Sequence, residues 1–345
     1  MRPWERFVDT VGFKPVDHVP VALIGTPRFY ASLAGVRLFE CLHDPCRMMD
    51  VELAAFRKFP EVTFIPGCWP DYGTGLFSAW GGRISWAEDA MPSVKQKYLR
   101  SEGDIKSFEP PDPQTDGLMP WHLETLKRFV RRKEDFGDNL HFVHSNGPGE
   151  LASYLWGMDN FLQGMYLEPE LTKDLLSRVT ETIIAWLSAQ SQILHDAQAM
   201  LITDDLAGLM STEMYKEFLL PLHTRIRQEF ADLIYTFHCD SKTDHILELL
   251  PEAGINVFQV GTTTDLARAK DKIGKRVCLM GNIDGVEVMQ RGDVASVRKA
   301  AQKCLGDAMA GGGYLLSTGG GVNEGTSEEK IRVLIDVAQS QGAYR

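Results

Sequence analysis

Two short polar clusters hold the side chains of this sequence that are best suited to chemistry. The first is Asp204-Asp205, which directly follows the apolar run at residues 200–203. Two adjacent carboxylates can hold a metal ion, share a proton or orient a basic partner. The structural alternative is that one aspartate caps a helix and the other pairs with an arginine.

The second cluster is Phe237-His238-Cys239-Asp240, which places an imidazole, a thiol and a carboxylate at the end of one predicted strand. All three groups can ligate a metal, and the histidine or the aspartate can act as an acid or a base. Because side chains alternate along a strand, His238 and Asp240 should share one side and Cys239 should point to the other. A hydrogen-bonded structural histidine is the alternative.

Spacing alone does not identify a zinc site, since the sequence has no C-x-x-C pair and no H-E-x-x-H helix. Glu217, early in the helix predicted after Asp205, is a further candidate if that helix brings it over the same strand ends. Exposure on the surface is the alternative for Glu217. The elements that position these residues therefore decide whether they form one site.

Short β-branched or aromatic runs alternate with long helical patterns, which indicates buried parallel strands joined by helices. The predicted strands are residues 19–24, 62–65, 141–145, 200–203, 233–238, 255–260, 277–281 and 314–317. The predicted helices include residues 37–59, 169–194, 212–230, 244–253, 294–309 and 327–340. Eight strands in strict alternation with helices favour a (β/α)8 TIM barrel over an open doubly wound sheet.

An open sheet that binds a dinucleotide would need a G-x-G-x-x-G turn after its first strand. Here the first strand is followed by Gly25-Thr26-Pro27-Arg28, which does not fit. A length of 345 residues suits one barrel with insertions. We therefore expect a single α/β domain over residues 1–345, with an N-terminal extension and with loops inserted over the barrel mouth at 71–106 and 110–120.

The ends of the predicted strands are strongly polar, as expected where a barrel places its active site. They carry Arg28, Cys68, Asp71, His144, Asn146, Asp204, Asp205, His238, Cys239, Asp240, Gln259, Asn282, Asp284 and Thr318. Burying so many polar groups would be costly unless they faced a ligand or one another. We predict that Asp204, Asp205, His238 and Asp240 are catalytic. The predicted substrate-binding residues are Arg28, Tyr30, Trp69, Asn146, Gln259, Asn282 and Gly320, with Phe77 as a further aromatic candidate; core packing is the alternative for each aromatic residue.

Composition narrows the class of partner. The net charge of −11 argues against binding to nucleic acid or to an anionic membrane, because both need clustered lysine and arginine. The six cysteines are scattered and follow no secretory leader, so we expect reduced thiols in the cytoplasm. No apolar run reaches the roughly 18 residues of a membrane span. Small molecules and protein partners remain.

The order of several motifs resembles the uroporphyrinogen decarboxylase superfamily, which includes the decarboxylase itself and corrinoid-linked, zinc-dependent methyltransferases. The resemblance runs over nearly the whole chain. Its motifs here are Pro15-Val16-Asp17-His18-Val19-Pro20, Asn146-Gly147-Pro148, Ile202-Thr203-Asp204-Asp205-Leu206, Tyr215-Lys216-Glu217-Phe218, His238, Met280-Gly281-Asn282-Ile283-Asp284 and Ser317-Thr318-Gly319-Gly320-Gly321-Val322. It implies a (β/α)8 barrel and a homodimer.

Two departures from the superfamily bear on the chemistry. The decarboxylases have an arginine-rich R-Q-A-G-R-Y segment after the first strand, whereas this chain has a single arginine there, Arg28, so a ligand with many carboxylates would meet little positive charge. The thiol-methylating members have His-x-Cys and a later cysteine as zinc ligands, whereas this chain has His238-Cys239-Asp240 and then Gly320. The resemblance therefore implies a harder, oxygen-rich zinc site, with His238, Glu217 and Asp240 as ligands and Asp204 beside them.

The expected function is transfer of a methyl group from a small methylated donor, such as an O-methyl aryl ether, to the cobalt of a corrinoid (cobalamin) carried by a partner protein. Zinc would act as a Lewis acid on the atom that bears the methyl group. Asp204 or Asp205 would orient the ligand or the histidine. The alternatives are a decarboxylase-like lyase without a metal, in which an aspartate protonates a carbanion, and a binding subunit without turnover.

Overall fold

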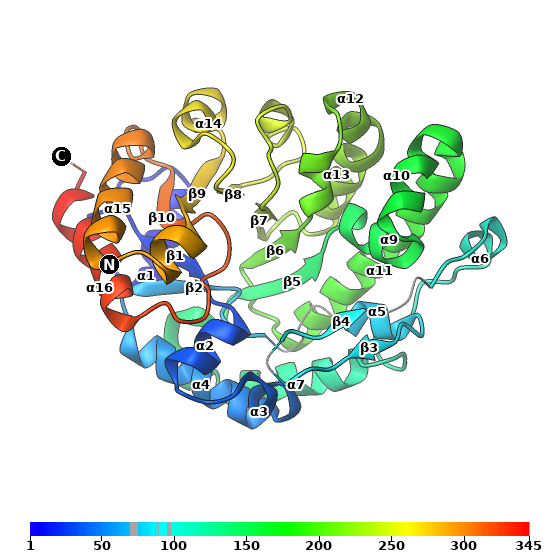
Figure 1. The fold of residues 1–345 in the computed structure, drawn as a ribbon, viewed down its shortest axis with the longest axis horizontal. Coiled ribbons are helices and arrows are strands. Elements are labelled where there is room, and N and C mark those ends of the chain that lie inside the picture. Colours follow the sequence, from blue (N-terminus) through cyan, green and yellow to red (C-terminus); the bar gives the residue numbers. More distant parts are fainter. Residues whose placement is uncertain (70–74, 89, 95–97, 345) are drawn as a thin grey trace.

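Eight parallel strands form a nearly closed barrel surrounded by helices (Figure 1). The structure is a computed structural model, and it describes residues 1–345 except 70–74, 89, 95–97 and 345. The barrel strands are β1 (Val21–Ile24), β2 (Val62–Ile65), β5 (Phe142–Asn146), β6 (Ala199–Thr203), β7 (Ile234–Cys239), β8 (Val257–Val260), β9 (Cys278–Ile283) and β10 (Tyr314–Thr318). The predicted TIM barrel and all eight predicted strands are confirmed, with ends that differ by at most two residues.

The strands pair in the order β2-β1-β10-β9-β8-β7-β6-β5, so within the described residues the ring has one seam without a strand pair, between β2 and β5. Asn139 crosses this seam from the segment before β5, because its Oδ1 accepts a hydrogen bond of 3.0 Å from the Phe64 amide. All barrel pairs are parallel, so their carboxyl ends meet at one end of the barrel.

Helices and short helical turns connect the strands. The α-helices are α1 (Pro3–Val11), α2 (Pro27–Leu33), α3 (Leu38–His43), α4 (Pro45–Lys58), α5 (Gly75–Ala79), α6 (Glu102–Lys106), α7 (Met119–Arg131), α8 (Lys133–Phe136), α9 (Pro148–Trp156), α10 (Met158–Leu167), α11 (Pro169–Ile193), α12 (Thr212–Met214), α13 (Leu220–Glu229), α14 (Leu266–Ile273), α15 (Val294–Ala308) and α16 (Glu328–Gln341). Turns of 3-10 helix are η1 (Gly137–Asn139), η2 (Asp205–Leu209) and η4 (Leu247–Leu249), and π turns are η3 (Tyr215–Leu219) and η5 (Gly285–Gln290).

Three predicted helices differ from the structure. The helix predicted over 37–59 is divided at Asp44, whose side chain caps α4 by accepting from the Cys46 amide at 2.9 Å. The helix over 212–230 contains the π turn η3, because Pro221 has no amide hydrogen for a regular helical bond. The helix predicted over 244–253 does not form: only the single turn η4 lies there, and it ends two residues before Pro251.

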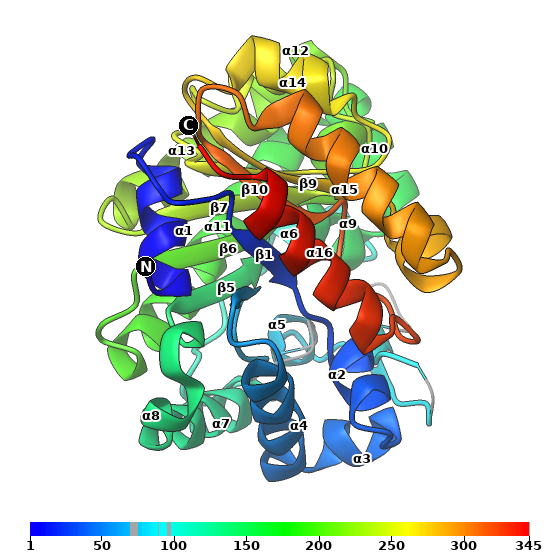
Figure 2. The ribbon, with the colours of Figure 1, turned by 90° about the vertical axis from the view of Figure 1, so that its left-hand side faces the viewer.

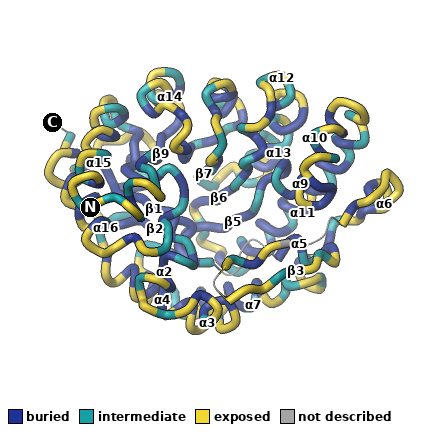
Figure 3. Tube along the Cα trace, in the orientation of Figure 1, coloured by how far each residue is buried: buried dark blue, intermediate teal, exposed yellow. Residues whose placement is uncertain are grey.

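Two apolar layers hold the barrel together, and Figure 3 shows the strands buried between exposed helix surfaces. The inner layer fills the barrel, and the N-terminal extension closes the amino-terminal end of the strands through α1, at the left of Figure 2. Trp4 stacks on His141 with ring centroids 4.2 Å apart, and Phe7 packs edge-on against Phe142. Because this end is plugged by aromatic rings, a ligand must enter from the carboxyl ends of the strands.

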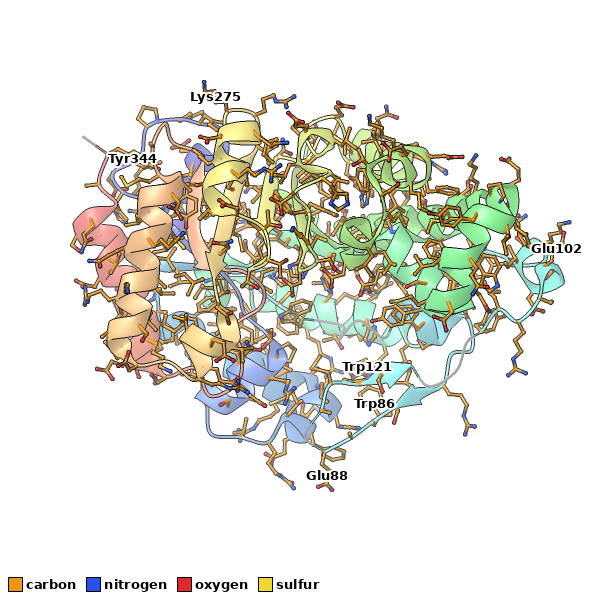
Figure 4. The ribbon with its side chains drawn as sticks, turned by 45° about the horizontal axis from the view of Figure 1, so that its top comes forward. Trp86, Glu88, Glu102, Trp121, Lys275 and Tyr344 are labelled. Carbon is orange, nitrogen blue, oxygen red and sulfur yellow. The ribbon has the colours of Figure 1, made fainter. Side chains whose placement is uncertain are left out.

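The long segment between β2 and β5 includes the antiparallel pair β3 (Ile84–Ser85) and β4 (Ser93–Val94). It contacts α3, because the Trp86 ring lies 5.0 Å from the ring of His43. Figure 4 labels Trp86 at the edge of the molecule. Met91, between β3 and β4, reaches the mouth of the barrel. Over the described residues, no helix is both long and apolar enough to cross a membrane.

Candidate active site

A cavity of about 460 Å³ lies at the carboxyl ends of the strands. Its described walls combine apolar side chains with a small set of polar ones. The lining residues are Ile24, Thr26, Pro27, Arg28, Trp69, Met91, His144, Ser145, Asn146, Leu201, Thr203, His238, Asp240, Gln290, Gly321, Asn323 and Glu324. A mostly apolar pocket with a few convergent polar groups is the usual form of a small-molecule site.

One row of polar residues crosses four neighbouring strands at this end of the barrel. Asn146 is in register with Thr203, Thr203 with His238, and His238 with Gln259. Residues in register on parallel strands point to the same face, so all four side chains face the inside of the barrel. Cys239, the next residue along β7, is buried in the outer apolar layer. His238 and Cys239 therefore point to opposite sides of the strand, as predicted from alternation.

Gln259 fixes the orientation of the His238 ring. The amide nitrogen of Gln259 donates to the carbonyl oxygens of Thr318 at 3.0 Å and Gly320 at 2.9 Å. Its amide oxygen must then face His238, where it makes a short contact with Nδ1. Because that oxygen can only accept, Nδ1 carries the proton and Nε2 of the neutral ring presents its lone pair.

Two carboxylates lie on the Nε2 side of this ring. Nε2 of His238 is 3.7 Å from Oδ2 of Asp240 and 4.0 Å from Oδ1 of Asp205. The same Oδ1 accepts a hydrogen bond of 2.6 Å from the Asp240 amide, which ties the end of β7 to the turn after β6. Partial burial raises the pKa of Asp240, an effect that His238 opposes and Asp205 reinforces.

Gly320 leaves room for the Asp240 carboxylate. A Cβ atom at Gly320 would lie 3.0 Å from Oδ1 and 3.2 Å from Oδ2 of Asp240, and its φ of +139° is one that side chains rarely adopt. The Asp240 carboxylate therefore fills the space that a side chain at position 320 would occupy.

Asp204 lies behind the site and not in the cavity wall. It is fully buried, and its carboxylate accepts hydrogen bonds of 2.9 Å from the amides of Gly149 and Glu150, in the first turn of α9. His223 lies on its other side, with Nε2 at 3.5 Å from Oδ2. Asp204 thus caps a helix, whereas its neighbour Asp205 faces His238.

Glu150 is a functional candidate that the sequence reasoning missed. Its Oε2 accepts a hydrogen bond of 3.0 Å from Thr203, which itself lines the cavity. Burial, together with the carboxylates of Asp204 and Asp205, raises the pKa of Glu150 to about 8. An acid in the first turn of a helix that directly follows a strand end was the available signal.

Trp69, predicted to bind substrate, lines one wall of the cavity. Its ring meets His144 edge-on at 5.2 Å, and its Nε1 donates to the Gly25 carbonyl at 2.5 Å. The backbone amide of Trp69 donates at 3.2 Å to Glu52, a fully buried carboxyl whose pKa burial raises well above its usual range. The wall is therefore held at both ends of the tryptophan.

Other predicted residues lie outside the cavity. Tyr30 and Phe77 are buried in the outer apolar layer. Asn282 holds a loop together by donating to the carbonyls of Gly261 and Thr264.

Glu217 points away from His238, because its carboxylate pairs with Lys173 on α11 at 2.8 Å and lies outside the described cavity wall. Asp71 falls outside the described residues.

The described residues contain no group of three histidine, cysteine, aspartate or glutamate side chains close enough to count as a formed metal site. The chemistry at His238 nevertheless suits a hard cation, because a directed imidazole lone pair faces two carboxylates within 4.0 Å. Ligand atoms on a tetrahedral zinc stand about 3.4 Å apart. A movement of about half an ångström or less would bring each carboxylate to that distance from Nε2.

A family model described as uroporphyrinogen decarboxylase (URO-D) matches residues 2–341. The uroporphyrinogen decarboxylase of Thioalkalivibrio sulfidiphilus is 25% identical over 363 residues, covering 98% of both chains. That of Xanthomonas euvesicatoria is 27% identical over 359 residues, covering 97% of this chain and 98% of the relative.

Among solved structures, a methyltransferase from Methanosarcina mazei superposes with a TM-score of 0.84 at 22% identity, covering 98% of each chain. A B12-independent methionine synthase from Shewanella sp. W3-18-1 superposes with a TM-score of 0.61 at 8% identity, covering 94% of this chain and 98% of that one. At these identities the likeness is one of fold.

Proposed function

The chain belongs to the uroporphyrinogen decarboxylase family, and within it we propose an enzyme that moves a methyl group from a small methylated donor to a corrinoid protein. The donor we favour is an O-methyl aryl ether. The observation that carries the proposal is the His238 ring, which Gln259 holds with its Nε2 lone pair toward Asp205 and Asp240.

The proposed zinc ligands are His238, Asp205 and Asp240. Asp205 replaces Glu217 in this set, since Glu217 pairs with Lys173. Bound there, zinc would be a Lewis acid that polarises the methyl-bearing oxygen. Gln259 holds the proton on Nδ1 and fixes the orientation of the ring, as outer partners of metal-binding histidines commonly do.

The cavity suits a small, flat, mainly apolar donor. Trp69, Met91 and Leu201 supply apolar surface, while Asn146 and Thr203 supply hydrogen-bonding groups in the row beside His238. Arg28 is the one lysine or arginine among the described lining residues, and Glu324 already binds it. A substrate with many carboxylates would find no unpaired cation there, which argues against a porphyrinogen.

A lyase acting on a small carboxylate is the second candidate. The names of the relatives in other organisms favour it, and so does Glu150, whose pKa of about 8 suits a proton donor near neutral pH. Glu150 reaches the cavity through the Thr203 hydroxyl. In this reading a carboxylated ligand would lose carbon dioxide, and the proton would come from the Glu150 side of the cavity.

Elemental analysis of the purified protein separates the two candidates. We expect about one zinc per chain in the wild type, and loss of that zinc in His238→Ala and Asp205→Asn. Lys173→Ala is the control. It removes the partner of Glu217, which is not a proposed ligand, so the variant should bind zinc as the wild type does. A loaded wild type would then be assayed for methylation of a corrinoid protein by methoxyphenol. A wild-type protein that cannot bind zinc, yet releases carbon dioxide from small aromatic acids, would establish the lyase instead.

A further inference from the structure

Arg28 and Glu324 form a bidentate ion pair at the rim of the cavity. Nε of Arg28 donates to Oε2 of Glu324 at 3.0 Å, and Nη2 donates to Oε1 at 2.5 Å. Arg28 is the second residue of α2, after β1, and Glu324 follows the glycine-rich turn after β10. Both residues line the cavity.

The backbone on both sides of Glu324 is anchored to the Arg28 segment. The Thr26 hydroxyl donates to the Val322 carbonyl at 2.8 Å, and the Gly325 amide donates to the Ser32 hydroxyl at 3.0 Å. An exposed ion pair usually contributes little because two flexible chains must be ordered. Here the two segments are already joined, so the pair needs little further ordering, and its two-pronged geometry is the strong form of an arginine-carboxylate contact.

The pair also sets the charge that a ligand meets. Among the described lining residues Arg28 is the single cation, whereas Asp240 and Glu324 are both carboxylates. Glu324 neutralises Arg28, whereas Asp240 lies beside His238, with its Oδ2 at 3.7 Å from Nε2. A ligand carboxylate would have to lose its water and displace Glu324 from Arg28, which would leave Glu324 unpaired beside it.

We propose that the Arg28–Glu324 pair is a charge filter that makes the cavity select uncharged methoxyarenes over carboxylated ones. This inference rests on the proposed function for the identity of the donor, but the filter itself concerns only the charge of the ligand. Glu324 is then a specificity-determining residue. Removing its charge would leave Arg28 without its carboxylate partner, and Arg28 could then bind the carboxylate of a ligand.

Two pairs of ligands test the filter by direct binding in calorimetry. The first pair is methoxyphenol and methoxybenzoate; the second is benzamide and benzoate, which have no methyl group to give. In the wild type, we expect the uncharged member of each pair to bind about 10-fold more tightly than the charged one. In Glu324→Gln, the affinity for the carboxylates should rise about 10-fold while that for the uncharged ligands stays within about 2-fold.

Three further measurements sharpen the test. Arg28→Gln in the Glu324→Gln background should abolish the gained carboxylate binding. Glu328→Gln, which removes a nearby exposed carboxylate that pairs with Lys58, should leave the ranking unchanged. Raising the salt concentration should narrow the wild-type preference, because exposed charges are screened.

The outcomes separate the filter from the proposed function. Equal binding of benzamide and benzoate by the wild type, no gain in Glu324→Gln, or no binding of any of the four ligands overturns the filter. A preserved benzamide preference with no methyl transfer from methoxyphenol leaves the filter standing and removes the proposed donor.

Discussion

Nδ1 of His238 faces the side-chain oxygen of Gln259, whose amide nitrogen is held by two backbone carbonyls at 3.0 and 2.9 Å. The two residues are in register on β7 and β8. Because the carbonyls belong to Thr318 and Gly320, the glycine-rich turn fixes the orientation of the Gln259 amide. The amide in turn fixes the orientation of the His238 ring. The Nε2 lone pair is thereby directed before any ligand binds.

Replacing Gln259 by leucine should weaken zinc binding about 10- to 100-fold without removing a ligand, because the ring loses its outer partner. Zinc affinity would be measured by competition with a chelator, alongside thermal unfolding to confirm that the barrel is intact. Gln302→Leu is the matched control, since Gln302 is exposed on α15 and contacts Gln341. Unchanged affinity in Gln259→Leu would remove Gln259 from the site.

The adjacent carboxylates Asp204 and Asp205 should respond differently to the same change. Asp204→Asn weakens two buried hydrogen bonds to the first turn of α9 and should lower the free energy of unfolding by roughly 2–4 kcal/mol. Asp205→Asn changes a half-exposed side chain and should cost less than about 1 kcal/mol, while zinc binding falls about 10-fold or more. Urea unfolding and zinc titration of both variants provide the comparison, and equal losses of stability would contradict the assignment.

The raised pKa of Glu150 predicts a pH dependence of stability. The folded pKa is about 8 and the unfolded value is 4.5, so the folded protein holds a proton that the unfolded chain releases between these values. The free energy of unfolding should therefore fall as pH rises from about 5 to 8, and this contribution should be flat outside that window.

Glu150→Gln mimics the protonated acid and should flatten that fall. Since Glu150 is only half-buried, we expect the variant to be more stable than the wild type by on the order of 2 kcal/mol at the alkaline end, with no difference near pH 4. The measurement is urea unfolding across the pH range. Glu170→Gln, which changes an exposed carboxyl on α11, should keep the wild-type slope.

The sequence was sufficient for the barrel because each buried parallel strand is a short continuous apolar run between helical patterns. Alternation along β7 likewise placed His238 and Cys239 on opposite sides. Helix direction was harder to predict, since periodicity shows which residues share a face but not where that face points. The prediction that Glu217 lies over the strand ends was wrong for this reason. The π turn η3 and Pro221 change the direction in which Glu217 points, and its side chain pairs with Lys173.

Contacts between residues at the ends of different strands could not be predicted from spacing. Arg28 and Glu324 are 296 positions apart, and Glu150 and Thr203 are 53 apart. Each pair meets only because the carboxyl ends of parallel strands converge, and the side chain that each loop presents depends on its turn. The presence of polar residues at the strand ends was predictable, whereas the residues that each of them contacts were not.

Gly320→Ala tests whether Asp240 uses the space beside the glycine-rich turn. The added Cβ would lie 3.0 and 3.2 Å from the two carboxylate oxygens, and the backbone φ of +139° is strained for alanine. We expect Asp240 to be displaced from His238, zinc affinity to fall about 10-fold or more, and stability to drop by roughly 1–3 kcal/mol.

Gly306→Ala is the matched control for this change. A Cβ at Gly306 meets nothing within 4 Å, and the residue lies inside α15, so the same substitution should stabilise the protein by about 0.5–1 kcal/mol. Zinc titration and thermal unfolding of both variants would be compared. Should Gly320→Ala bind zinc as the wild type does, Asp240 would not be a ligand, and the oxygen-rich site would have to be built from His238 and Asp205 with a group from the substrate.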